Sequence, residues 1–209
     1  LRENHFNLAA EVYKKIIELY PTSALTAEAK LGFARSLESE LYDEYVKSIP
    51  LWKPFFPLSK FESEKIAKVL SAFDAVVNLY KHSEPAYEAL LRSGMIKFYL
   101  QNEIEDAKRL LNIVTTEAPL SLSAVDAFLE LGNISLIEGN LDKAEKNYSA
   151  LLNNNRVQND KKSSATYKLS RVCFYQLKFK EAIKYLSDVL KNLKDNSAND
   201  ALELSLILN

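Results

Sequence analysis

Few residues of this 209-residue sequence have the types and spacing that catalysis or metal binding requires. His5 and His82 are the two histidines, and neither has a Cys, His or carboxylate partner at the spacing of a metal-binding motif. Cys173 is the single cysteine, and we interpret it as a packing thiol rather than a nucleophile. The sequence also lacks a glycine-rich phosphate loop. We therefore predict no catalytic residue, no metal site and no cofactor, and we predict that the chain is not an enzyme.

The amino-acid composition favours helices. Four Gly and six Pro are too few for a fold with many tight turns, such as a β-sandwich or a barrel. The sequence contains no run of 18 or more apolar residues, so we predict no direct insertion into a membrane. Because the sequence begins at Leu1 rather than at Met, we expect it to be part of a longer protein.

The charges are balanced overall but not locally. The 27 basic and 28 acidic side chains give a net charge of −1, and this creates no overall field that would attract nucleic acid. Residues 143–194 hold 12 basic and 4 acidic side chains. This stretch is either a solvated lysine-rich face or a patch that binds an acidic partner. No base-reading pair of residues recurs along the chain, so we predict no nucleic-acid binding.

Apolar residues recur with the period of an α-helix almost throughout the chain. Leu8, Val12 and Ile16 are spaced by four, and charged residues occupy the other faces. Proline, Gly-Asn and Asn-rich segments fall between such stretches, where helices must end. The pattern predicts an all-α fold with ten helices, over residues 4–20, 24–46, 61–82, 85–101, 103–117, 121–139, 141–155, 160–177, 179–194 and 197–209.

Four of the predicted helices carry the same short pattern. An alanine is followed by a large apolar residue four positions later and by another seven positions later, starting at Ala9, Ala107, Ala144 and Ala182. Pro21 and Pro119 follow the first two at an offset of 12. The last three alanines are 37 and 38 residues apart, so the chain has internal repeats of two helices each.

The stretch around Ala144 extends this pattern into the preceding helix. It reads Phe128, then Leu131-Gly132, then Gly139, Leu141, Ala144 and Tyr148. This order resembles the tetratricopeptide repeat. HEAT-type repeats are an alternative, but they do not explain Leu-Gly followed by Gly, Ala and Tyr. The sequence departs from the family pattern in its longer period, in Met95 and Ser170 at the Gly position, and in Ser135 where the family prefers an aromatic residue.

The resemblance implies a right-handed α-solenoid of about five antiparallel helix pairs, with small residues where the paired helices cross. We expect a single repeat domain over residues 1–209. In this family the first helix of each pair lines the concave surface, and this implies a groove that binds a partner protein or peptide. Carried over position by position, the groove residues are Arg92, Ile96, Tyr99, Leu129, Asn133, Leu136, Tyr167, Arg171, Phe174 and Tyr175.

The groove predicted in this way is partly apolar and partly basic, and it suits a segment with acidic character. Ile96 and Phe174 have an equally good alternative interpretation as core residues. Of the Lys, Asn and Arg set with which some family members clamp a C-terminal carboxylate, only Asn133 and Arg171 have counterparts here.

Residues 47–61 interrupt the repeats with a segment rich in proline and aromatic residues. Its prolines prevent a helix, and Trp52, Phe55 and Phe56 are costly to expose to water. These rings either cover neighbouring helices or form an arm that binds a partner.

The predicted function is that of a non-catalytic scaffold or adaptor. The alternative is a structural spacer or oligomerisation module that docks through its terminal helices, because residues 197–209 are rich in leucine and carry no polar cap. The oligomeric state is open. Residues 20–23, Tyr-Pro-Thr-Ser, resemble a junction in tetratricopeptide proteins of the bacterial cell envelope, and this favours the periplasm over the cytoplasm.

Overall fold

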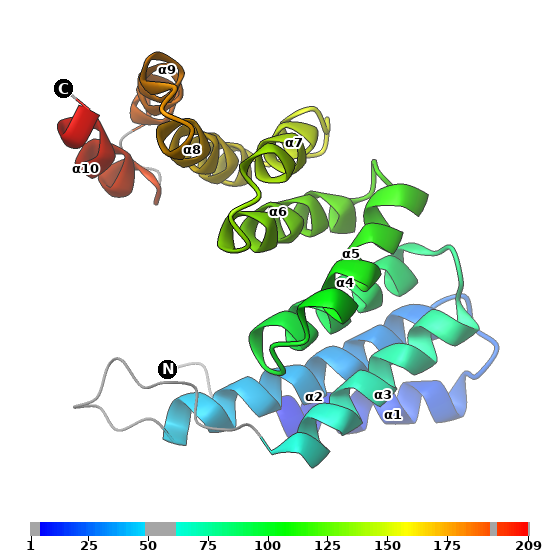
Figure 1. Cartoon of the computed structure of the whole chain (residues 1–209). Coiled ribbons are helices and arrows are strands. Elements are labelled where there is room, and N and C mark those ends of the chain that lie inside the picture. The colour runs from blue at the N-terminus through cyan, green and yellow to red at the C-terminus, as the bar shows by residue number, and fades with distance from the viewer. Residues whose placement is uncertain (1–4, 49–61, 193–195, 209) are drawn as a thin grey trace. The chain divides into compact units, whose positions relative to one another are not determined.

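The computed structural model describes residues 5–48, 62–192 and 196–208, and the insertion residues Trp52, Phe55 and Phe56 lie outside these ranges. Ten α-helices occupy the described part of the chain (Figure 1). Their bounds are α1 Phe6–Leu19, α2 Thr26–Ser48, α3 Ser63–Leu79, α4 Glu84–Tyr99, α5 Ile104–Glu117, α6 Leu122–Ile137, α7 Leu141–Leu152, α8 Asn159–Tyr175, α9 Phe179–Leu190 and α10 Ala198–Leu208.

The all-α fold with successive packed helix pairs is confirmed. Many helices that follow each other in the chain pack together, as α1 does with α2, α6 with α7 and α8 with α9. The predicted helix over 141–155 ends earlier, at Leu152. The side chain of Asn154 explains this, because it accepts a hydrogen bond from Arg156 N at 2.9 Å and donates one to Pro119 O at 3.1 Å. These bonds stabilise a turn instead of a further helical turn.

The chain divides into two compact units, residues 1–110 and 111–209. The core of the first unit contains Phe73 and Val76 of α3 with Leu31 of α2. The core of the second unit contains Tyr148 of α7 and Leu169 of α8. The single domain expected over residues 1–209 stays a prediction.

The repeated alanine pattern marks buried core positions in the second unit. The residues at its three positions in α7 and α9 are all buried, with at most 2% of each exposed. They are Ala144, Tyr148, Leu151, Ala182, Leu186 and Val189. The pattern therefore identifies core residues, because a small side chain lets two helices approach and the larger ones fill the space beside it.

Glycine has a specific packing role at two helix crossings. A Cβ atom added to Gly132 of α6 would lie 2.6 Å from Tyr148 Cδ1 of α7. A Cβ atom added to Gly32 of α2 would lie 2.5 Å from Tyr13 Cζ of α1. In both pairs a tyrosine ring lies directly on the glycine, and any larger residue would displace the ring.

The α6–α7 and α8–α9 turns share one hydrogen-bond pattern. In the first, Asn140 N donates to Ser135 O at 2.8 Å, and in the second, Lys178 N donates to Cys173 O at 2.8 Å. These are Schellman motifs, in which the residue after the helix takes a left-handed conformation. That residue is Gly139 in the first turn and Leu177 in the second, with φ of 73° and 62°. Leucine is strained there, and 73% of Leu177 is exposed.

We expect Leu177→Gly to stabilise the protein by about 1 kcal/mol, because glycine adopts positive φ without a steric penalty. The exposed leucine side chain contributes little burial that could be lost. For a chain of this length, the midpoint of thermal unfolding should rise by about 2–4 °C, measured by circular dichroism. Gly139→Leu is the converse control and should lower it. A lower midpoint for Leu177→Gly would contradict the prediction.

Candidate functional site

The predicted groove residues fall on three helices. Arg92, Ile96 and Tyr99 belong to α4 in the first unit. The remaining seven belong to α6 and α8 in the second unit, and they are Leu129, Asn133, Leu136, Tyr167, Arg171, Phe174 and Tyr175.

On α4, only one of the three residues has an exposed side chain. Ile96 has no exposed surface and packs in the core that contains Phe73, so a partner could not contact it. Tyr99 is exposed, with its ring edge-on to Phe98 at a centroid distance of 4.7 Å.

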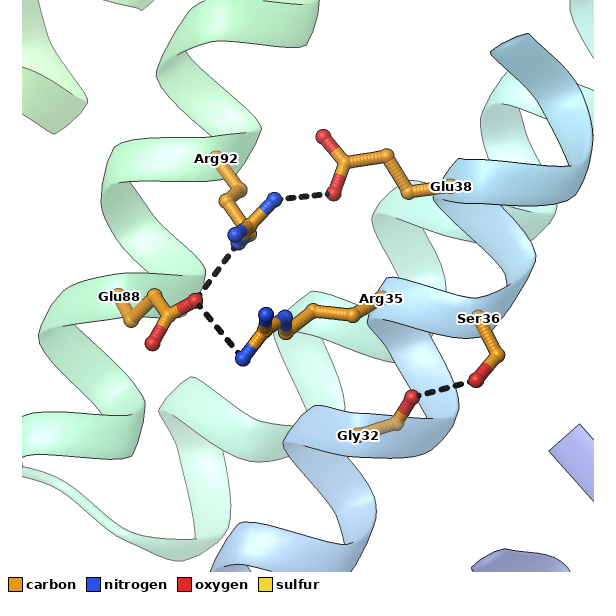
Figure 2. A network of polar contacts seen from close by, with 6 residues as sticks. All are labelled: Gly32, Arg35, Ser36, Glu38, Glu88 and Arg92. Atoms are coloured by element: carbon orange, nitrogen blue, oxygen red, sulfur yellow. Dashed lines mark hydrogen bonds and ion pairs between the residues drawn. The ribbon is translucent and has the colours of Figure 1, made fainter. Parts of the chain in front are cut away.

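Arg92 connects α4 to α2 through a network of charged side chains (Figure 2). Arg92 Nη1 donates to Glu38 Oε2 at 2.7 Å, and Arg92 Nε donates to Glu88 Oε1 at 2.8 Å. Arg35 Nη1 lies 3.6 Å from the same Glu88 oxygen. Because two carboxylates already bind this guanidinium, Arg92 holds two helices together, and its charge is already compensated within the chain.

Glu38 is the most buried acid of this network. Burial raises the pKa of its carboxyl group, and the charge of Arg92 opposes this rise. A raised pKa means that the folded state binds the proton more tightly than the unfolded state. The stability that this proton binding contributes is therefore complete below the unfolded value near 4.5 and declines as the pH rises through the raised pKa.

We expect Glu38→Gln to become more favourable relative to the native protein as the pH increases from 4 to 7. Glutamine cannot ionise, so it removes the contribution of Glu38 to the pH dependence of folding. Urea unfolding of both proteins at several pH values measures this difference. If Glu38→Gln instead becomes less stable relative to the native protein as the pH rises, the ion pair with Arg92 dominates and lowers the pKa of Glu38.

On α6, the three predicted residues mainly support the fold of the second unit. Asn133 Oδ1 accepts a hydrogen bond from the Tyr148 hydroxyl at 3.0 Å, and Asn133 Nδ2 donates to Glu130 Oε2 at 3.1 Å. Leu129 and Leu136 are half-buried against the core that contains Tyr148. Asn133 therefore orients the hydroxyl of Tyr148.

On α8, Arg171 lies among tyrosines. Its Nη2 donates to the Tyr175 hydroxyl at 3.3 Å, and its guanidinium carbon lies 5.9 Å from the centroid of the same ring. The hydrogen bond to Tyr175 raises the pKa of Arg171, while burial acts in the opposite direction. Tyr167 is also close enough for its phenol to interact with the charge of Arg171. The arginine thus remains a fixed positive charge beside aromatic rings.

Lys168 is a functional candidate that the sequence interpretation missed. It lies three residues before Arg171 and so on the same face of α8. Burial lowers the pKa of Lys168, the charge of Arg171 lowers it further, and Glu130 opposes this change. Its i, i+3 spacing from Arg171 was the signal that could have identified it.

Neither Lys168 nor Arg171 has a carboxylate within ion-pair distance among residues 5–48, 62–192 and 196–208. The contrast with Arg92, which has two carboxylate partners, is clear. Glu130 attracts Lys168 without forming a close ion pair with it, and two neighbouring cations that repel each other and form no close ion pair can bind an external anion favourably.

Aromatic rings extend from this cation pair to the end of α8. The Phe174 ring centroid lies 5.7 Å from that of Tyr175 and 6.1 Å from that of Phe179, which begins α9. Phe174 is half-buried, whereas Tyr175 and Phe179 are exposed. The surface therefore combines cations and exposed rings, the residue types that contribute most energy at protein interfaces.

The structure also bears on three other possibilities, which are a reactive cysteine, a metal site and a membrane-spanning helix. Cys173 is buried, and burial raises the pKa of its thiol, so it is protonated near neutral pH. Within the described ranges, no three His, Cys, Asp or Glu side chains come together as ligands for one metal ion. No helix in the described part of the chain is long and apolar enough to cross a membrane.

Part of the chain matches the sequence model of a known family. The sequence model of the tetratricopeptide repeat matches residues 88–121, which include most of α4 and all of α5. No curated protein matches the chain in sequence. Repeats of this family generally mediate protein–protein interactions.

Two solved structures are similar to the chain over nearly its whole length. The MamA protein has a TM-score of 0.57 at 18% sequence identity, with 93% of this chain and 86% of that chain covered. A thermophilic TPR protein of Thermus thermophilus has a TM-score of 0.57 at 14% identity, with 97% and 90% covered. Residues 88–121 are therefore a tetratricopeptide repeat, and the chain is a helical repeat protein with the tetratricopeptide fold.

Proposed function

We propose that this chain is a non-catalytic scaffold that binds an acidic protein or peptide segment on the surface formed by α6 and α8. The observation that carries the proposal is the pair Lys168 and Arg171, which has no carboxylate partner in the described part of the chain. We name the surface around this pair the α8 surface, and it consists of Asn133, Tyr167, Lys168, Arg171, Phe174 and Tyr175.

The charges of the α8 surface favour an acidic ligand. Lys168 and Arg171 each raise the electrostatic energy of the other, and partial burial weakens the screening by water. A carboxylate of the partner would relieve this repulsion. The guanidinium of Arg171 donates only one hydrogen bond within the described part of the chain, so donors remain for bidentate binding of a carboxylate.

The aromatic residues supply the apolar part of the interaction. Tyr175 already packs beside Arg171, so both side chains lose little further conformational freedom on binding. Tyr167 is half-buried against the α9–α10 core, and this fixes one side of the surface. We therefore propose a segment that carries both acidic and apolar residues, bound in an extended or helical conformation.

The experiment compares three forms of the 209-residue chain as baits in a cell lysate, with retained proteins quantified by mass spectrometry. They are the native chain, the double variant Lys168→Glu with Arg171→Glu, and a control double variant, Lys143→Glu with Lys146→Glu on α7. The control lysines are exposed, and no ion pair of theirs occurs among the described residues. The control therefore makes the same change in net charge at a different surface.

We expect a protein that the native chain and the control retain and that the α8 variant loses, with affinity that falls as salt increases. Equal retention by all three forms, or no retained protein, would contradict the proposal. Circular dichroism of each form checks that both double variants are folded.

A further inference from the structure

The turn between α8 and α9 holds a leucine where two similar turns hold asparagine or glycine. Each of the three turns is closed by a backbone hydrogen bond of 2.8 Å, from Glu103 N to Lys97 O, from Asn140 N to Ser135 O and from Lys178 N to Cys173 O. The residue before each donor is left-handed, and these residues are Asn102, Gly139 and Leu177, with φ of 56°, 73° and 62°. Asparagine and glycine tolerate this conformation, whereas leucine is strained in it. Leu177 thus costs stability that the other two turns do not lose.

The folded chain gains little from Leu177 in return. Its side chain is 73% exposed, so it buries little apolar surface. The turn does not need leucine either, because Asn102 and Gly139 support the same hydrogen bond at the same length. Strained residues that persist are concentrated at functional sites. A leucine side chain can offer a partner only apolar contact, so the strain points to an apolar contact made on binding.

Two aromatic rings extend the exposed apolar surface on either side of Leu177 in the sequence. Tyr175 is 49% exposed and Phe179 is 45% exposed. Both rings contact Phe174, with centroid distances of 5.7 Å and 6.1 Å, so they belong to one cluster. The counterpart of Phe179 in the α6–α7 turn is Leu141, which also lies three residues before the repeated alanine but is half-buried. We name Tyr175, Leu177 and Phe179 the turn patch.

The turn patch has both lysines and acids beside it. Lys178 Nζ lies 3.5 Å from Glu145 Oε2. Gln176 Nε2 donates to Asp142 Oδ1 at 3.3 Å and to Glu145 Oε2 at 3.2 Å, so both acids lie near the turn. Residues 180–181, Lys-Glu, follow the patch and are exposed. Because Lys178 is already paired and acids are close, this end disfavours an acidic side chain of a partner and suits an apolar one.

The cations of the α8 surface lie further back along the same helix. Arg171 and Lys168 lie four and seven residues before Tyr175, so the three side chains share one face of α8. The acids that interact with this end belong to other helices, and they are Glu130, which attracts Lys168, and Asp200 and Glu203, which act on Tyr167. Arg171 instead interacts most strongly with Tyr175. An acidic side chain of a partner therefore finds its counter-charge at Arg171 and Lys168.

We propose that the partner segment places an acidic side chain at Arg171 and Lys168 and a large apolar side chain on the turn patch, with Leu177 as its main apolar contact. This binding mode rests on the proposed function of the α8 surface and adds a spacing to it. Along α8, Arg171 and Lys168 lie about 6 Å and about 10 Å from Tyr175, at about 1.5 Å per residue. An extended segment advances about 3.3 Å per residue, so its acidic and apolar residues are about two to three positions apart.

Fluorescently labelled synthetic peptides test this binding mode. The two probes are Asp-Asp-Ser-Ser-Leu-Phe and its reverse, Phe-Leu-Ser-Ser-Asp-Asp, because either chain direction suits the α8 surface. For each probe, one control peptide has Asn-Asn in place of the two aspartates, and the other has Ser-Ser in place of the leucine and phenylalanine. Fluorescence anisotropy measures the Kd of each peptide for the 209-residue chain. We expect one probe to bind at least about tenfold more tightly than both of its control peptides.

Leu177→Gly should weaken the binding of that probe about tenfold, because it removes the leucine side chain from the contact. The same variant is expected to be more stable than the native chain, so unfolding cannot explain the loss. Leu177→Met keeps an apolar side chain and should bind the probe like the native chain. Leu120→Gly is the matched control, since Leu120 is 66% exposed in the α5–α6 turn, and it should leave the Kd unchanged.

The control peptide without apolar residues separates the contact at Leu177 from the proposed acidic site. Lys168→Glu with Arg171→Glu should weaken the binding of both the probe and this control peptide, whereas Leu177→Gly should weaken only that of the probe. If Leu177→Gly binds the probe as tightly as the native chain, the contact at Leu177 is wrong, and a loss confined to the double variant leaves the acidic site in place. If neither probe binds more tightly than its control peptides, the contact is also wrong, and the lysate comparison still decides the acidic site.

Discussion

Gly132→Ser is expected to lower the free energy of unfolding by about 3 kcal/mol, which is large for a substitution that adds two heavy atoms. The new Cβ would lie 2.6 Å from Tyr148 Cδ1, and the ring cannot move aside because Tyr148 has no exposed surface. Displacement of the ring would also break the hydrogen bond between its hydroxyl and Asn133. Urea unfolding followed by circular dichroism measures the loss.

The next repeat suggests the control. Ser170 takes the place of Gly132 there, and Leu186 takes the place of Tyr148, with both side chains buried. Ser170 is larger than Gly132, and Leu186, which faces it across the helix crossing, is smaller than Tyr148. The double variant Gly132→Ser with Tyr148→Leu should therefore lose clearly less stability than the sum of the two single variants. Additive losses would show that the contact between Gly132 and Tyr148 is not the cause.

Arg92→Ala should destabilise the protein by about 3 kcal/mol, because it leaves the buried carboxylate of Glu38 without its partner. We expect the lower end of the usual range for buried pairs, since the Arg92 side chain is 29% exposed and water can replace part of the interaction. The loss should be smaller at pH 4 than at pH 7, because protonation of Glu38 removes the unpaired charge. Urea unfolding at both pH values measures it.

Two comparisons separate this effect from a general effect of losing an arginine. Arg109→Ala removes an exposed arginine whose ion pair with Asp106 spans 3.4 Å, and it should cost less than about 0.5 kcal/mol. The double variant Arg92→Met with Glu38→Leu should recover most of the loss, because apolar residues of similar volume replace the pair. If Arg92→Ala costs no more than Arg109→Ala, the network does not hold α2 to α4.

The helices and many core residues could be predicted from the sequence because their signals are local. Apolar periodicity and the residues that end helices act over a few positions, and they predicted all ten helices close to their observed bounds. The alanine pattern identified Ala144 and Ala182 as core residues because helix crossings require small side chains at regular intervals. The resemblance to the tetratricopeptide repeat depended on the same short pattern, so it needed no tertiary information.

The roles of individual side chains depended on residues far away in the sequence, and only the tertiary structure decided them. Arg92 and Arg171 are both arginines on first helices, yet Arg92 binds Glu38, which is 54 residues away. Arg171 has only Tyr175 as a hydrogen-bond partner in the described part of the chain. Ile96 became a core residue because α3 supplies Phe73 beside it. The sequence by itself thus determined the repeated helices, whereas tertiary packing decided which side chains remain available for a partner, because that depends on which long-range neighbours already satisfy them.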